Sequence, residues 1–242
     1  MAELELIGFL DGLTALIIIA FGFIAASIMY YKAYKMNAKF LQLGAIMSVF
    51  AVLLWLGPTI DFLTILLTQN NLDNSAGLYG ILSYMWVPPA LITALYLGSV
   101  MLAPKSKTII LIIYSIIGVI FELLLFLDTA NAFIFTDPFP PTIDFVSGTQ
   151  LIDSRFNSSH PIFYLIAIFL VSLVALNGVG SLRQAAKSPG VIRKKSMGMA
   201  TVFFLFPIVA IIDAYLPAGP ILFVSRSGMI VIAVFMYLAL KP

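Results

Sequence analysis

The chain has 242 residues, of which 62% are hydrophobic and only 10% are charged, and its mean hydropathy is +1.09. A soluble domain of this length cannot bury so much apolar surface, so the composition indicates a membrane protein with lipids as its main surroundings. The net charge of +2 gives no reason to expect nucleic acid, and the absence of cysteine excludes disulfides, cysteine-bound zinc and iron–sulfur clusters.

Seven apolar runs are long enough to cross a bilayer core of roughly 30 Å, and they predict an all-α bundle of seven transmembrane helices in one domain, 1–242. The start, "MAELELIGFL", has two glutamates and no basic residue, so we expect the first helix to be retained rather than cleaved as a signal peptide. The predicted spans are 7–31, 40–68, 78–103, 108–128, 161–182, 196–216 and 219–240.

Basic residues gather at alternate ends of these spans. Of the thirteen lysines and arginines, all except Arg155 and Arg226 fall on one side, which the positive-inside rule makes cytoplasmic. The acidic residues fall on the other side or in the outer part of a span. The pattern predicts a multi-pass protein of the cell membrane with its amino terminus outside and its carboxyl terminus in the cytoplasm.

The longest loop, 129–160, is expected outside the membrane. In it, "TIDFV" and "TQLID" flank "SG", and apolar residues that alternate around a Ser-Gly turn favour a short β-hairpin, which would lie over the bundle as a lid. An irregular loop is the alternative interpretation.

Arg226 lies about six residues inside the last apolar run, "ILFVSRSGMIV", and so about 10 Å below the outer surface at the rise of an α-helix. Four acidic residues from other spans are expected in the same outer layer: Asp11, Asp61, Glu122 and Asp213. Because a charge in hydrocarbon costs several kcal/mol unless it is paired or reaches water, Arg226 is expected to face inward. Asp213, Asp61 and Glu122 are its candidate partners.

Two interpretations of this charged layer remain open. It is either a buried ion pair that only fixes helix packing, or a polar ligand-binding site that opens to the outside beneath the 129–160 loop. In the second case the excess of acids over Arg226 favours a cation or an amine, or a response to protonation.

Proline and aromatic residues occupy the same half of the predicted bundle. Pro58, the Pro88–Pro89 pair and Pro207 each free backbone carbonyls and predict kinks in the second, third and sixth spans. Trp86 and Tyr84 precede the paired prolines. They are candidate lining residues of the site, although such aromatics also serve as ordinary packing or interfacial residues.

Motifs of catalysis are missing from the sequence. It has no Walker loop, no HExxH and no GxSxG, and its single histidine, His160, falls in the outer loop. The predicted cytoplasmic segments are too short to form an enzyme domain. We therefore expect no enzymatic activity, no metal site and no cofactor, while intramembrane carboxylates leave a proton-relay subunit as an alternative.

Seven spans with an outside amino terminus match the topology of rhodopsins and G-protein-coupled receptors. The last span has no lysine for a retinal Schiff base, since Arg226 and Ser227 stand where one would be sought. No DRY follows the third span and no NPxxY ends the seventh, so neither of these families is indicated.

The stretch "SRSGMIVIAVFMYLALKP" at 225–242, with "WVPPALITALYLG" in the third span, resembles the seven-helix membrane sensor domains of archaeal signalling proteins, including those that precede histidine kinases. The resemblance implies a receptor-like protein that passes a signal to the cytoplasm. The sequence ends where a kinase or PAS domain would begin. It therefore either stops short of such a domain or relies on a separate signalling partner.

The sequence thus predicts a non-enzymatic membrane sensor with a polar, acidic site in the outer half of its bundle. One alternative is a core subunit of a larger respiratory or transport complex, in which the charges pack against neighbouring chains. A small-solute or ion transporter is the third interpretation.

Overall fold

The computed structural model describes residues 4–135, 147–215 and 220–240, without the side chains of residues 215, 220–223 and 240. Of the residues that it describes, 81% are helical, and the chain is an all-α membrane bundle. Its elements are α1 (Leu6–Lys35), α2 (Lys39–Val52), η1 (Leu53–Trp55), α3 (Leu56–Thr68), α4 (Leu78–Tyr84), α5 (Val87–Leu102), α6 (Lys107–Leu127), α7 (Thr129–Ala132), β1 (Phe133–Phe135), β2 (Ser154–Phe156), α8 (Pro161–Leu173), η2 (Val174–Gly178), α9 (Val179–Lys187), α10 (Gly190–Tyr215) and α11 (Pro220–Leu240).

Six helical stretches of the described chain are long and apolar enough to cross a membrane, and they match the first six predicted spans closely. They are Leu6–Lys35, Lys39–Thr68, Leu78–Leu102, Lys107–Leu127, Pro161–Lys187 and Gly190–Ala214. In α11, the apolar stretch is shorter, Val224–Ala239. The count of seven spans and the orientation of the termini therefore stay predictions.

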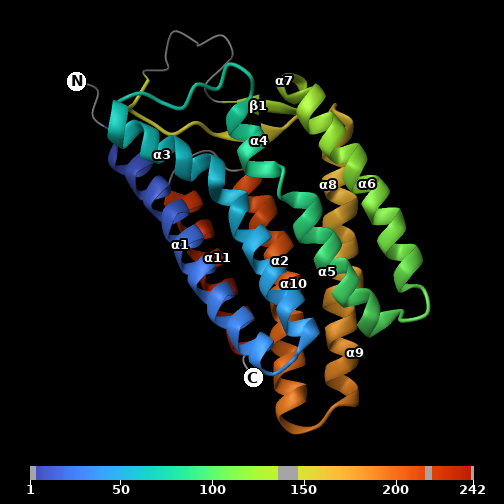
Figure 1. The fold of residues 1–242 in the computed structure, drawn as a ribbon. Coiled ribbons are helices and arrows are strands. Elements are labelled where there is room, and N and C mark those ends of the chain that lie inside the picture. The colour runs from blue at the N-terminus through green and yellow to red at the C-terminus, as the bar shows by residue number, and fades with distance from the viewer. Residues whose placement is uncertain (1–3, 136–146, 216–219, 241–242) are drawn as a thin grey trace.

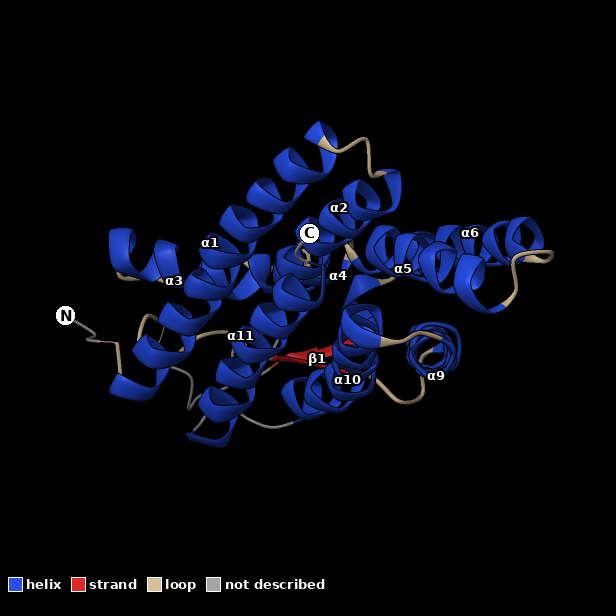
Figure 2. Cartoon of the chain, turned by 90° about the horizontal axis from the view of Figure 1, so that it is seen from below, coloured by secondary structure: helices blue, strands red, loops and turns tan. Residues whose placement is uncertain are grey.

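Most of the helices surround a central space. α1 packs against α2 and α11, α11 against α10, α10 against η2 and α9, and α5 against η2, α8 and α2. α6 stands outside this ring and packs on α5 and α8, so that it lies at the edge of the bundle in the end-on view (Figure 2). The strands and α7 lie together at one end of the molecule (Figure 1).

Proline positions coincide with two interruptions of the long helices. The second span passes through the 3₁₀ turn η1 three residues before Pro58, and the third breaks between α4 and α5, with Pro88 and Pro89 in the first turn of α5. α10 continues through Pro207 without a break in its helical assignment. The π-helical turn η2 in the fifth span follows no proline.

The strands of the outer loop differ from the predicted hairpin. β1 pairs antiparallel with β2, Phe133 opposite Phe156, whereas "TQLID" (149–153) is not a strand and "TIDFV" (142–146) lies outside the described residues. The reason is that backbone groups of 149–153 bind elsewhere. Thr149 O accepts from Glu5 N at 2.8 Å, and Ile152 N donates to Asp61 at 2.8 Å.

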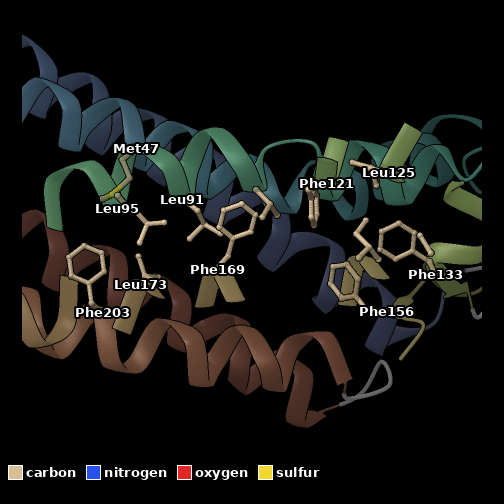
Figure 3. Close-up of a cluster of buried hydrophobic side chains, with 14 residues drawn as sticks. Met47, Leu91, Leu95, Phe121, Leu125, Phe133, Phe156, Phe169, Leu173 and Phe203 are labelled. Carbon is tan, nitrogen blue, oxygen red and sulfur yellow. The ribbon is translucent and has the colours of Figure 1, made fainter. Parts of the chain in front are cut away.

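The main hydrophobic core runs along α5. Figure 3 shows its side chains in a row from Phe133 and Phe156 of the strand pair, through Phe121 and Phe169, to Phe203 of α10. The aromatic contacts of the strand pair therefore continue directly into the core of the bundle.

Candidate functional site at the outer end of the bundle

Arg226 lies in the bundle and is only 5% exposed. Its Nε donates to Asp213 Oδ1 at 3.2 Å, and its Nη1 donates to the backbone carbonyl of Asp11 at 3.2 Å. The pairing of Arg226 with Asp213 expected from the sequence is therefore present. One guanidinium joins α11, α10 and α1, because each of these three residues comes from a different helix.

The surroundings of this ion pair are acidic. Asp11 and Asp153, together with the hydroxyl of Tyr79, lie close enough to Arg226 to interact with it electrostatically, and all three are buried. Three carboxyl groups thus share one guanidinium, and the site favours a ligand that carries positive charge or donates hydrogen bonds.

Asp61 belongs to a different arrangement, although it has the expected depth. This fully buried carboxylate accepts from Leu72 N and Ile152 N, both at 2.8 Å, and from Asn71 Nδ2 at 3.1 and 3.2 Å. Asn71 in turn donates to Gln150 O at 2.9 Å. These contacts hold two outer loops onto the end of α3, so the described partners of Asp61 are structural.

Glu122 and Trp86 lie away from the ion pair. Glu122 is on the peripheral helix α6, where its Oε2 is buried without a hydrogen-bond partner among the described residues. Trp86 stacks on Phe50, with ring centroids 6.2 Å apart, and is not among the residues that line the central cavity. The expected depth of a residue along a helix does not show toward which neighbour its side chain points.

Tyr84 is where the sequence placed it, at the outer end of the central space. Its ring stacks on Phe133 at a centroid distance of 5.0 Å and lies against Phe156 at 4.5 Å. The strand pair therefore covers this end of the bundle.

A cavity of about 430 Å³ lies at the centre of the helical ring. Asp213 and Tyr84 line it together with apolar residues of α1, α2, α5, α8, α10 and α11. The Asp213 side chain is 20% exposed, while that of Arg226 is 6% exposed. One carboxylate oxygen of Asp213 thus binds Arg226, while part of the side-chain surface faces the cavity.

Sequence reasoning missed three polar residues that the structure makes important. Asn71 completes the Asp61 arrangement, and Asp153 lies near Arg226. Asn177, 1% exposed in η2, donates to Ala94 O at 2.7 Å and so joins the fifth span to α5. Asn177 could have been found from the sequence, because an asparagine inside an apolar run places an amide in hydrocarbon, where it needs a hydrogen-bond partner.

The described residues contain no group of three or more histidine, cysteine or acidic side chains that could hold a metal ion. The Asp213–Arg226 pair provides charge and hydrogen-bonding groups with which a ligand can be recognised.

The position of Asp153 predicts a pH dependence of stability. Burial raises the pKa of this outer-loop carboxyl from 3.8 to about 6, although the charge of Arg226 opposes the rise. Since the folded chain holds the proton more tightly than the unfolded chain, the free energy of unfolding should fall by about 3 kcal/mol as the pH rises from about 4 to about 6. We expect Asp153→Asn to remove this fall.

Unfolding in detergent, followed between pH 4 and pH 7, measures the effect. Asp73→Asn is the matched control, because Asp73 is an exposed loop acid whose pKa is lowered by hydrogen bonds from Ser75, so that it stays ionised over this range. The control should keep the wild-type fall. An Asp153→Asn variant with an unchanged pH profile would assign the effect to another group.

Comparison with known protein families finds none that matches the chain. Comparison with curated proteins likewise finds no match.

Proposed function

We propose that this chain is a non-enzymatic membrane sensor or receptor-like protein that binds a small ligand at the Asp213–Arg226 pair. One observation carries the proposal: the pair joins three helices at the outer end of a cavity, and Asp213 faces that cavity. The excess of acidic groups near Arg226 favours a cationic or amine-bearing ligand. The resemblance to archaeal sensor domains, the cell-membrane location and the outward amino terminus belong to the same proposal.

Binding can produce a signal because Asp213 would accept hydrogen bonds both from the ligand and from Arg226. A ligand that takes a hydrogen bond from the ion pair weakens the link between α10 and α11, and Pro207 lies between Asp213 and the cytoplasmic half of α10. A movement of α10 would change the surface around Arg193, where we expect a signalling partner to bind. The ligand shifts the equilibrium only if it binds one helix arrangement better than the other.

Thermal unfolding of the purified chain in mild detergent, screened with small amines and organic cations, tests the site. We expect an active compound to raise the melting temperature of the wild type, and to have a much smaller effect on Asp213→Asn and Arg226→Ala. Asp73→Asn is again the matched control, because Asp73 is an exposed acid that binds only its own loop in the described contacts, and it should respond as the wild type does. Equal stabilisation of all four proteins would place the ligand elsewhere.

A subunit of a larger membrane complex is the second candidate function, and Glu122 favours it. Glu122 is a partly exposed acid on α6, a helix in which only Gly118, Phe121 and Leu125 are buried. A neighbouring chain packed on α6 would cover this carboxyl group and the exposed apolar residues around it. Purification of the chain alone distinguishes the two functions: a stable monomer or homodimer supports the sensor, and instability relieved only by co-purified partners supports the subunit.

A further inference from the structure

The central cavity is lined almost entirely by apolar side chains. They include Ile18 of α1, Leu91 of α5, Phe203 of α10 and Met229 of α11. Small residues such as Ala233 help to keep the space open. An apolar cavity is a poor site for ordered water, which needs two to four polar partners. An apolar molecule fits this lining better.

One side of the cavity faces the bilayer between α8 and α10. α10 packs closely on η2 and α9, but its contact with α8 is slight. Val171 of α8 and Ile211 of α10 both line the cavity, yet they are 68% and 48% exposed. Val171 lies ten residues into α8 and hence about 15 Å along it, at a depth where the surroundings are hydrocarbon. The cavity is therefore open to lipid from the side.

Polar groups mark the outer end of the same space. Asp213 presents carboxylate surface to it, and Tyr84 and Phe156 close it toward the strand pair. Asp213 is therefore the hydrogen-bond acceptor that the cavity offers to the head group of an occupant.

We propose that the cavity binds a single-chain lipid alcohol, which enters from the bilayer between α8 and α10 and places its hydroxyl group at the Asp213 end. The hydroxyl can donate to Asp213 without bringing a further charge into the hydrocarbon. A carboxylate head group is disfavoured by the acidic residues around Arg226. This inference rests on the proposed function, because it names the ligand class of the same site.

Photocrosslinking of the full chain in phosphatidylcholine nanodiscs tests the proposal. The probe is a hexadecanol with a diazirine in its chain, and mass spectrometry of the peptides locates the adducts. We expect adducts on α10 and α11 near Phe203 and Met229. Oleyl alcohol and oleylamine should both compete, because both head groups donate to Asp213, and oleic acid should compete at least tenfold less well.

Two substitutions provide the matched pair of variants. Ala233→Phe fills the cavity and should reduce labelling at least tenfold, while Val234→Phe adds the same side chain at the neighbouring position, which is 37% exposed and outside the lining. Val234→Phe should leave labelling unchanged. Melting temperatures of both variants show whether each is folded, and Ala210→Phe fills the same space from α10 if Ala233→Phe is not.

Three outcomes would overturn the inference. Equal competition by the alcohol, the acid and octadecane would mean that only an acyl chain of the surrounding phospholipid occupies the cavity. Labelling unaffected by both cavity-filling variants would place the probe on the outer surface. If a small amine stabilises the wild type through Asp213 while the probe leaves the cavity unlabelled, the proposed function stands and the lipid ligand is wrong.

Discussion

Arg226→Met is expected to lower the free energy of unfolding by about 3 to 5 kcal/mol, because removing one partner of a buried ion pair strands the other. The substitution keeps the length and the apolar stem of the side chain. It leaves Asp213 without its guanidinium and removes the hydrogen bond from Arg226 to the Asp11 carbonyl, which keeps Thr14 Oγ1 as a donor at 2.8 Å. The loss should appear in chemical or thermal unfolding of the purified chain in detergent.

A double-mutant cycle separates the direct pairing from other effects of the substitution. Asp213→Asn combined with Arg226→Met should recover part of the loss, with a coupling energy of about 1 to 3 kcal/mol between the two positions. Glu122→Gln with Arg226→Met is the control cycle, since Glu122 lies on the peripheral helix α6. It should be additive within about 0.5 kcal/mol. Strict additivity of Arg226 with Asp213 would contradict the pairing.

Arg226→Lys adds a test of geometry. The lysine keeps the positive charge, but it cannot reach Asp213 Oδ1 and the Asp11 carbonyl with the two groups of a planar guanidinium. We expect an intermediate loss of stability. If Arg226→Lys were as stable as the wild type, the positive charge alone would account for the stabilisation, and the hydrogen bond to the Asp11 carbonyl of α1 would not contribute.

The apolar pattern predicted the helices well because membrane spans are defined by length and hydrophobicity, which are local properties of the sequence. The Arg226–Asp213 pair could also be predicted from the sequence. Only a few residues separate α10 from α11, so the adjoining ends of these two helices must lie close together. Depth alone was less informative for Glu122. Glu122 lies on α6, which is outside the ring, and a hydropathy pattern does not show which helices are neighbours.

The outer loop was the least predictable part, because its backbone is organised by single side chains rather than by a repeat. Alternating residues in "TQLID" suggested a strand, yet the amide of Ile152 binds a carboxylate on α3 instead. Asp61 and Asn71 were separated from that loop by about 80 to 90 residues of sequence. Contacts of this kind leave no periodic signal.

Asp61→Ala is expected to be at least as damaging as the loss of Arg226. The carboxylate is fully buried and accepts from Leu72 N and Ile152 N, each at 2.8 Å, and from the amide of Asn71. Hydrogen bonds to a charged group contribute about 1.5 to 3 kcal/mol each, and buried donors left without an acceptor add a further penalty. We expect a loss of about 3 to 5 kcal/mol in the free energy of unfolding.

Hydrogen exchange gives this prediction a local readout that general destabilisation would not reproduce. The amides of Leu72 and Ile152 should exchange much faster in Asp61→Ala, while amides in the middle of α5 keep their protection relative to global unfolding. Asp61→Asn retains one carbonyl oxygen and should lie between the wild type and Asp61→Ala. Asp73→Ala is the matched control, because Asp73 is an exposed acid of the neighbouring loop that accepts from Ser75 N. If exchange at Leu72 and Ile152 stayed at the wild-type rate in Asp61→Ala, another residue would have to hold the two loops together.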